Sequence, residues 1–92
     1  MAKYNIEYTG SFKKDYKRCM KRHCDMTLLK HAIALLAETG TLPKEYKPHK
    51  LSGKYQDLWE CHLESDWLLV WQQDENVLRL LFYRTGTHFD LF

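Results

Sequence analysis

Two side chains that can exchange protons near neutral pH lie in the aromatic-rich stretch Leu58–Trp71. His62 falls at the end of one apolar run and Asp66 at the start of the next, with the acidic segment Glu64–Asp66 between the runs. Two apolar runs around such a break predict a β-hairpin. Because a neighbouring carboxylate can orient a histidine and tune its titration, the hairpin predicts an acid–base pair held at a rigid corner.

Two further candidate histidines lie outside the hairpin. His49 lies in Thr41–Gly53, whose prolines and closing glycine predict a loop, and a long loop in a small domain is often functional. His88 lies in the tail that follows Arg84. Each histidine also has a structural interpretation, as a loop residue bonded to backbone, a partner that pins the hairpin, or a cap on a turn. Taken singly, the structural interpretations are favoured.

The chain has 92 residues, enough for one domain, 1–92, with one modest core. A hydrophobic content of 45% favours a folded globule over a disordered chain. The three cysteines are odd in number and lack CxxC spacing, so they predict reduced thiols in a cytoplasmic protein rather than disulfides or a cysteine zinc site. No apolar run approaches the ~20 residues of a membrane span, and no signal peptide is recognised.

The predicted elements are a strand, two helices and three more strands. The first strand is Lys3–Thr9, and Ser11 is expected to cap the helix after it. Asp25 is expected to cap the second helix, which Gly40 closes in the left-handed conformation. The later strands are predicted at Lys54–Leu63, Trp67–Gln72 and Val77–Arg84, and the tail is too short for another full element. We expect an α+β fold, with an N-terminal strand and a two-helix hairpin packed on a small antiparallel sheet in two layers.

Positive charge is concentrated on the first predicted helix. Six of the fourteen Lys and Arg residues lie between Lys13 and Arg22, and an apolar face recurs at helical spacing: Phe12, Tyr16, Cys19 and Met20. The default interpretation of such a helix is a solvated basic face. The sharper interpretation is a docking surface for nucleic acid or an acidic partner, and the sequence alone favours the default.

Three separated segments of the chain match one family pattern. They are Tyr46-Lys47-Pro48-His49-Lys50-Leu51-Ser52-Gly53, Glu60-Cys61-His62-Leu63-Glu64-Ser65-Asp66-Trp67 and Arg84-Thr85-Gly86-Thr87-His88. In this order and spacing they resemble the YafQ-type toxins of the RelE/ParE superfamily of bacterial toxin–antitoxin modules. The similarity covers nearly the whole chain, including Ile6-Glu7-Tyr8 and the basic helix. It implies a RelE/ParE-like two-layer sandwich.

The resemblance implies a ribosome-dependent mRNA endonuclease. It also implies a cognate antitoxin that silences the toxin and represses the operon, so operator DNA is reached only through the antitoxin complex. The other implied partners are the ribosome and mRNA, without a membrane. The family's active-site residues match three histidines, an aspartate and two aromatics: His49, His62, His88, Asp66, Trp67 and Phe92. The two aromatics would offer faces on which an unstacked base can rest.

RNA can be cut without a metal or another cofactor when its own 2′-hydroxyl attacks the adjacent phosphate. This reaction needs a base, an acid and positive charge on the phosphate. We expect His88 to act as the general acid and Asp66 or His49 as the base, and the two assignments can be exchanged. His62 is expected to orient or stabilise the phosphate.

Basic side chains are expected to contribute further contacts. Arg84 is the expected electrostatic contact to the phosphate. Relatives often have arginine where this chain has Trp59, so the missing cation has to come from Arg84 or the basic helix. Lys17 and Arg18 are expected to contact ribosomal RNA or an acidic segment of the antitoxin.

Two alternatives use the same residues differently. The three histidines and Asp66 could ligate zinc, but no HxxxH or HExxH spacing supports a metal site, and none is predicted. Other members of the superfamily arrest growth by binding a protein target such as DNA gyrase. Those members generally lack such a cluster of acid–base residues, so the cluster favours a nuclease.

Overall fold

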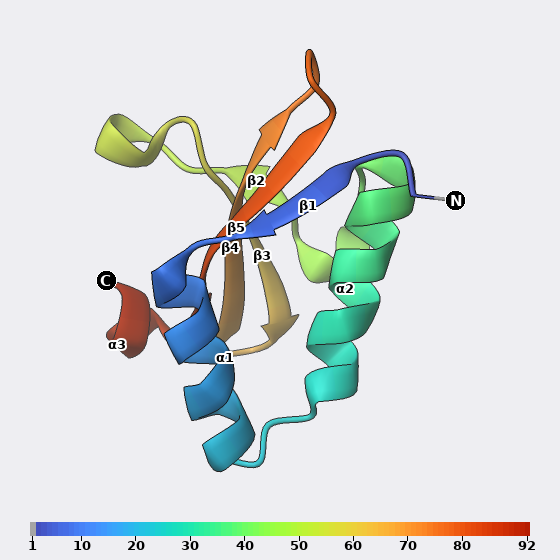
Figure 1. Cartoon of the computed structure of the whole chain (residues 1–92). Helices are drawn as coiled ribbons and strands as arrows, with labels where there is room; N and C mark the ends of the chain where they lie inside the picture. Colours follow the sequence, from blue (N-terminus) through green and yellow to red (C-terminus); the bar gives the residue numbers. More distant parts are fainter. Residues whose placement is uncertain (1) are drawn as a thin grey trace.

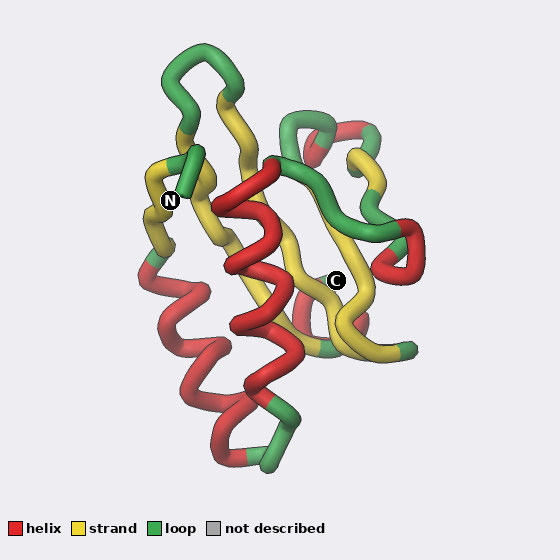
Figure 2. Tube along the Cα trace, turned by 90° about the vertical axis from the view of Figure 1, so that its right-hand side faces the viewer, coloured by secondary structure: helices red, strands yellow, loops and turns green. Residues whose placement is uncertain are grey.

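The structure is a computed structural model that describes residues 2–92, and Figure 1 shows their arrangement. The strands are β1 Asn5–Tyr8, β2 His49–Lys50, β3 Trp59–Glu64, β4 Trp67–Asp74 and β5 Arg79–Gly86. The helices are α1 Gly10–Lys21, α2 Met26–Thr39 and the single turn α3 His88–Leu91, with short 3-10 segments η1 Lys44–Tyr46 and η2 Gly53–Tyr55. The predicted α+β fold is confirmed, because α1 and α2 cover the same face of the sheet, as Figure 2 shows from the side.

The five strands form one sheet in the order β1-β5-β4-β3-β2. β3, β4 and β5 pair in antiparallel fashion, as predicted, and β2 pairs with β3 in the same way. β1 pairs in parallel with β5, so the sheet is mixed. The last strand of the chain thus lies between the first strand and β4. Apolar periodicity identifies a strand without fixing its neighbour or its direction, which is why the sequence did not reveal the parallel pair.

β1 pairs with β5 only as far as Tyr8, so the last part of β5 has no neighbouring strand on that side. Residues that follow Tyr8 in the chain bond to this part of β5 instead. Thr9 Oγ1 donates to the carbonyl oxygen of Tyr83 at 2.7 Å. Asp15 in α1 accepts the backbone N–H of Thr85 at 3.2 Å. α1 therefore replaces a strand at this edge, because buried backbone groups need hydrogen-bond partners.

The two long helices begin at side-chain caps. Thr9 caps α1, rather than Ser11 as expected, because its hydroxyl accepts the backbone N–H of Phe12 at 2.9 Å. Asp25 caps α2 as predicted. Met20, expected on the apolar face of α1, is instead exposed.

Gly40 closes α2 with φ 75°, the left-handed conformation that was predicted. A Cβ at this position would lie 2.5 Å from the hydroxyl oxygen of Tyr4. We expect Gly40→Ala to lower the free energy of unfolding in urea by about 1–2 kcal/mol through its backbone conformation alone, and further through displacement of the buried tyrosine. Gly53→Ala is the matched control, because Gly53 has φ 65° and open space where a Cβ would lie. Equal losses in the two variants would contradict a contribution from Tyr4.

Side chains alternate between the two faces of the sheet. One face packs against α1 and α2 and forms the core, with Trp67, Leu69 and Trp71 of β4. The opposite face carries Glu60, His62, Leu68 and Val70, and we call it the site face. The sheet therefore separates the helical layer from the candidate chemistry.

The predicted strand boundaries shift at two places. Lys54–Leu58, expected to begin a strand, instead forms η2 and a turn, so β3 begins at Trp59. The strand predicted to begin at Val77 begins at Arg79, because Asp74 Oδ1 accepts the backbone N–H of Val77 at 3.2 Å and holds that residue in a turn. These aspartate contacts are local turn chemistry that competes with strand pairing.

Two segments predicted without regular structure contain short elements. The loop Thr41–Gly53 contains η1 and also β2, which pairs with β3 so that His49 lies opposite Glu60. The tail forms α3, whose first turn begins at His88. Both elements are too short to show a periodic pattern, and both carry a candidate histidine.

The three cysteines are free thiols. Burial raises the pKa of Cys61 to about 12 and that of Cys19 to about 11, so both remain protonated near neutral pH. Across residues 2–92, no helix combines the length and the apolar composition needed to cross a bilayer.

Candidate active site

Three histidines from distant parts of the sequence lie in a row on the site face. His49 comes from β2, His62 from β3 and His88 from the start of α3. The ring centroids of His49 and His62 lie 6.4 Å apart, and those of His62 and His88 lie 6.0 Å apart. Pairing of β2 with β3 positions the first two rings, and docking of α3 brings the third. The fold therefore joins the three histidines named from separate segments.

A buried carboxylate that sequence reasoning missed holds the His49 end of the row. His49 Nε2 lies 3.2 Å from Oε1 of Glu60, whose side chain is 8% exposed. His49 Nδ1 lies 2.8 Å from the carbonyl oxygen of Lys47, which can only accept, so Nδ1 carries a proton. The alternation of Glu60 and His62 along one strand was a signal for this residue.

Glu60→Gln is expected to lower the rate of the RNA cleavage that the family resemblance implies by about tenfold to 100-fold, because a neutral amide replaces the carboxylate that holds His49. The ¹⁵N chemical shifts of the His49 ring would report the change in its protonation. Glu64→Gln is the matched control at the exposed end of the same strand. Unchanged His49 shifts and unchanged cleavage in Glu60→Gln would contradict a role for the carboxylate.

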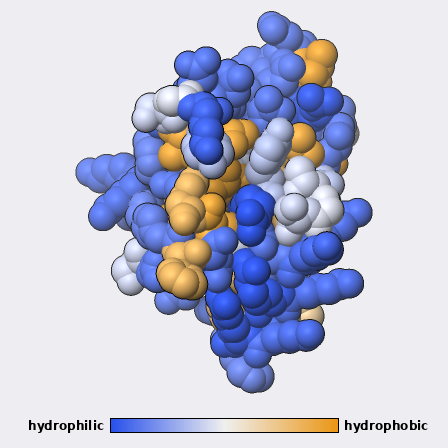
Figure 3. All heavy atoms as spheres, turned by 90° about the vertical axis from the view of Figure 1, so that its left-hand side faces the viewer, coloured by the Kyte–Doolittle hydropathy of each residue, from blue (hydrophilic) through white to orange (hydrophobic). Residues whose placement is uncertain are grey.

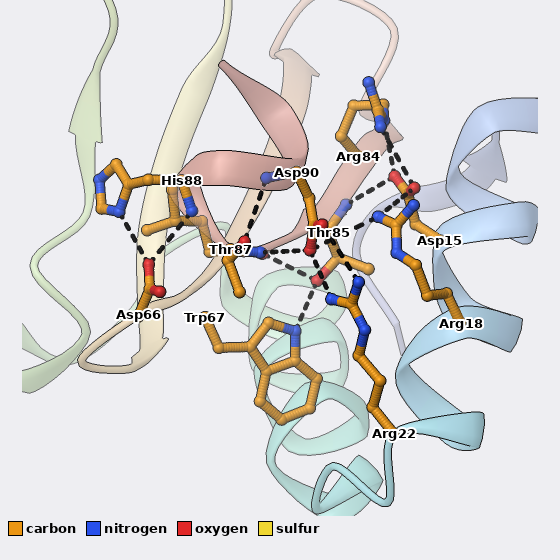
Figure 4. A network of polar contacts seen from close by, with 11 residues as sticks. Asp15, Arg18, Arg22, Asp66, Trp67, Arg84, Thr85, Thr87, His88 and Asp90 are labelled. Atoms are coloured by element: carbon orange, nitrogen blue, oxygen red, sulfur yellow. Dashed lines mark hydrogen bonds and ion pairs between the residues drawn. The ribbon is translucent and has the colours of Figure 1, made fainter.

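Asp66 holds the other end of the row. Its Oδ1 accepts the backbone N–H of His88 at 3.1 Å and lies 3.1 Å from His88 Nδ1, as Figure 4 shows. The backbone hydrogen bond and then the ring contact hold the pKa of Asp66 below its usual value. A carboxylate with a lowered pKa is a weaker proton acceptor, so Asp66 is better suited to orient His88 than to act as a base. His88 Nε2 remains free of this contact.

His62 occupies the middle of the row. Neither of its ring nitrogens has a hydrogen-bond partner among residues 2–92, in contrast to His49 and His88. It lies on a central part of β3 opposite Leu68, where the strand fixes its position. The middle imidazole is therefore the one whose two nitrogens are both available to a ligand.

The α3 turn that carries His88 is held by a second set of polar contacts, drawn in Figure 4. Thr87 and Asp90 form a capping box, in which Thr87 Oγ1 accepts the backbone N–H of Asp90 at 3.0 Å and Asp90 accepts that of Thr87 at 3.0 Å. Arg22 at the end of α1 donates to Asp90 at 2.7 Å. This hydrogen bond holds the pKa of Asp90 well below its usual value. The basic helix thus anchors the tail.

Asp15 is the centre of a neighbouring network and is 2% exposed. It accepts from Arg84 Nε at 2.6 Å and from Arg84 Nη2 at 3.2 Å, while Arg18 Nη2 approaches it at 2.8 Å. Arg18 also lies 3.8 Å from Asp90. Both guanidinium groups are therefore paired with carboxylates. The Arg18 side chain is 34% exposed, so its contact with ribosomal RNA or an acidic segment of the antitoxin stays a prediction. Lys17 remains exposed.

Trp67, expected as a stacking surface for a base, lies in the core. It is 5% exposed, and its Nε1 donates to Thr85 Oγ1 at 2.9 Å. Its ring faces the helical layer because its position in the alternation of β4 is opposite to that of Leu68. The expectation that this residue offers a face to RNA is wrong for this conformation.

Trp59 also points away from the histidines. Its ring stacks on Trp71 with centroids 6.1 Å apart and an angle of 14° between planes. Since it alternates with Glu60, position 59 lies on the helix-facing side of β3. Trp59 therefore does not occupy a position from which an arginine could contact the RNA phosphate at the histidine row.

Phe92 and Arg84 border a cavity of about 420 Å³ beside the row. We call it the tail cavity, and it is lined by residues of η2, β4, β5 and α3. Phe92 is 57% exposed, and its ring meets that of Tyr55 edge to face with centroids 5.8 Å apart. Arg84 keeps its Nη1 group outside the hydrogen bonds with Asp15, so part of its charge is available there.

Across residues 2–92, no group of three His, Cys, Asp or Glu side chains is arranged to hold a metal ion.

The chain is similar in sequence to known proteins. Residues 4–92 match the family model described as the bacterial toxin of type II toxin–antitoxin system, YafQ. The chain is 43% identical over 93 residues to the mRNA interferase toxin YafQ of Escherichia coli strain K12, covering 100% of this chain and 99% of that protein.

Solved structures give the same result for the fold. The toxin in the E. coli DinJ–YafQ toxin–antitoxin complex superposes with a TM-score of 0.89 at 41% identity, covering 98% of each chain. A metal-bound toxin from Helicobacter pylori superposes with a TM-score of 0.88 at 38% identity over the full length of both chains. A family match that spans residues 4–92, together with these relatives, shows that the chain belongs to the YafQ family of toxins of type II toxin–antitoxin systems.

Proposed function

We propose that this toxin is an endoribonuclease that cuts mRNA on the ribosome by activating the RNA's own 2′-hydroxyl. The observation that carries the proposal is the row of His49, His62 and His88 on one face of the sheet, with spacings of 6.4 and 6.0 Å. Three imidazoles at this spacing can reach a 2′-oxygen, a phosphate and a leaving 5′-oxygen in sequence. The relative named as an mRNA interferase supports the same activity.

The hydrogen bonds suggest a division of roles. His88 is held by Asp66 through Nδ1, so a protonated Nε2 can donate to the leaving 5′-oxygen. His62 has both nitrogens free of protein contacts and is the better candidate for the base than His49 or Asp66, which were expected from the sequence. His49 has both ring nitrogens engaged, by Glu60 and by the Lys47 carbonyl, so it would position Glu60 at the row rather than donate to the phosphate. Arg84, whose Nη1 lies outside the hydrogen bonds with Asp15, would supply positive charge for the phosphate.

We also propose that an antitoxin partner binds the groove between β1, α1 and α2. The groove has a volume of about 670 Å³ and apolar walls that include Tyr8, Phe12 and Ile33. Lys13, Lys17 and Lys30 line its rim, so an acidic amphipathic segment would match it. The E. coli relative is known in complex with an antitoxin, which supports a protein partner of this kind.

The direct test is to map 5′ ends of mRNA on purified ribosomes programmed with a defined message. The wild-type toxin is expected to cut translated message in the ribosomal A site and to leave the same message intact when initiation is blocked. Equal cutting of both messages would refute dependence on the ribosome, and no cutting of either would refute the nuclease.

A chelator arm tests the metal-free chemistry. A toxin from H. pylori is known in a metal-bound form. The cleavage rate of untreated toxin should therefore be compared with that of EDTA-treated toxin, at the same magnesium concentration, which the ribosome needs. The proposed mechanism predicts equal rates, because every proton transfer is assigned to a side chain. A rate lost with treatment and restored by zinc or copper would overturn it.

A further inference from the structure

The turn α3 carries His88 but buries little of itself. None of its four residues is buried, Phe89 is 94% exposed, and Phe92, which follows the turn, is 57% exposed. Figure 3 views the side of the molecule that carries α1 and α3, where apolar side chains lie at the surface beside strongly hydrophilic ones. A single helical turn is unstable on its own, because few hydrogen bonds compensate for the ordering of its backbone. Polar contacts are therefore the main hold on α3, and with it on His88.

The contact between His88 and Asp66 is a weak part of that hold. The two side chains are 58% and 64% exposed, and Nδ1 of the histidine lies 3.1 Å from the carboxylate. Exposed ion pairs contribute little to stability, because water screens both charges. The Asp66 contact orients the ring of His88, but it does not fix the turn that carries the ring.

Asp90, two residues after His88, is the carboxylate that ties α3 to the rest of the molecule, as Figure 4 shows. Its side chain is 9% exposed. Arg22 donates to both of its oxygens, at 2.7 and 3.3 Å, and the backbone N–H of Thr87 donates to one of them at 3.0 Å. A guanidinium that meets a carboxylate through two hydrogen bonds fixes direction as well as distance. Asp90 therefore joins the turn rigidly to the end of α1.

The surroundings of Asp90 are shaped for this ion pair. Arg18 and Arg22 are four positions apart on α1, so both side chains lie on the side of the helix that faces α3, and Arg18 approaches Asp90 at 3.8 Å. Gly86 precedes the turn, and a Cβ there would lie 2.9 Å from Oδ2 of Asp90 and 3.1 Å from Nη2 of Arg18. A larger residue at position 86 would therefore push the carboxylate away from the arginines.

We infer that Arg22 and Asp90 are positioning residues for RNA cleavage, because their ion pair fixes α3 and so holds Nε2 of His88 at the histidine row. This inference rests on the proposed nuclease function, in which His88 donates a proton to the leaving 5′-oxygen. Proton transfer needs the donor within hydrogen-bond reach, so a frayed turn would leave the acid out of place for part of the time. The ion pair therefore raises the rate of the chemical step rather than the affinity for the ribosome.

Amide hydrogen exchange of the isolated toxin tests the hold on α3 without any cleavage. The backbone N–H groups of Leu91 and Phe92 donate within the turn at 3.1 and 2.9 Å, so their exchange reports whether the turn is formed. Arg22→Met is expected to speed both exchanges by about tenfold, since it removes a charge-assisted hydrogen bond. Lys21→Met is the matched control, because it removes the same charge from the neighbouring exposed position of α1 and should leave both exchanges unchanged.

Single-turnover cleavage on saturating ribosomes gives the second measurement. Saturation removes the effect that a lost positive charge has on ribosome binding. Arg22→Met is expected to lower the rate by about tenfold, while Lys21→Met should cleave at the wild-type rate. Arg22→Lys should recover part of the loss, because an ammonium group can still donate to Asp90 but without the two-point contact.

A double-variant cycle tests whether Arg22 acts through His88. If it does, Arg22→Met should cause no further loss in the His88→Ala toxin, because the group that it positions is already gone. A contribution to the fold alone would lower the rate equally in both backgrounds. Equal losses, or unchanged exchange at Leu91 and Phe92 in Arg22→Met, would overturn the inference even if the wild-type toxin cuts mRNA. No cutting by the wild-type toxin would instead refute the nuclease, and this positioning role with it.

Discussion

Replacing His88 with alanine is expected to lower the rate of mRNA cleavage on ribosomes by about 10²–10⁴-fold, the usual contribution of a positioned general acid. The side chain is 58% exposed and makes its one side-chain contact with Asp66 at 3.1 Å. Its removal therefore leaves the core unchanged, and the midpoint of thermal unfolding should stay close to that of wild type. Single-turnover cleavage with excess toxin would separate this chemical step from ribosome binding.

Two further variants are compared with His88→Ala. His31→Ala removes an exposed histidine from α2 and is expected to cleave as wild type does. Asp66→Asn keeps an acceptor for the backbone N–H of His88 but weakens the hold on its ring, so its loss should be smaller than that of His88→Ala. A His88→Ala toxin that cleaves within a few-fold of wild type would contradict the assignment.

The same variant separates the nuclease from a toxin that arrests growth by binding a protein such as gyrase. Growth arrest by a nuclease should disappear with His88→Ala, because arrest then depends on the cut. A protein-binding toxin should retain arrest, since one exposed histidine at the start of α3 is a small part of a binding surface. Retained arrest with intact folding would favour the binding alternative.

The sequence predicted those parts of the fold that depend on local pattern. Asp25 and Gly40 mark the ends of α2 because capping and the left-handed conformation are properties of single residues. The parallel pairing of β1 with β5 depends on contacts between residues more than 70 positions apart, such as Ile6 and Leu80. No local signal carries that information, although the order of the elements already predicted the two layers.

The candidate site divides in a similar way. The sequence named His62 from the hairpin, His49 from the long loop and His88 from the tail, and the family resemblance joined them into one site. Their convergence depends on β2 and α3, which are too short for periodicity to reveal. Trp67 was assigned to the site because it matches the family's active-site tryptophan, while strand alternation turns it toward the helices. Alternation would have separated it from His62 and would have added Glu60.

The second large effect concerns Asp15. We expect Asp15→Ala to lower the free energy of unfolding by about 3–5 kcal/mol, because it leaves Arg84, Arg18 and the backbone N–H of Thr85 without their buried acceptor. For a domain of this size that corresponds to a fall of about 12 °C or more in the midpoint of thermal unfolding. Urea unfolding followed by tryptophan fluorescence would measure it, and Glu38→Ala, an exposed position on α2, is the control expected to stay within about 0.5 kcal/mol.

A double-variant cycle tests whether Asp15→Ala lowers the free energy of unfolding because it leaves the positive charge of Arg84 without a partner. If it does, Arg84→Met in the Asp15→Ala background should recover part of the stability, because the guanidinium that lost its partner is removed as well. Arg84→Met alone should cost less than Asp15→Ala, since Arg18 and the Thr85 N–H would still satisfy the carboxylate. Additive losses would show that Asp15 acts mainly through the backbone of β5, where it replaces the strand that ends at Tyr8.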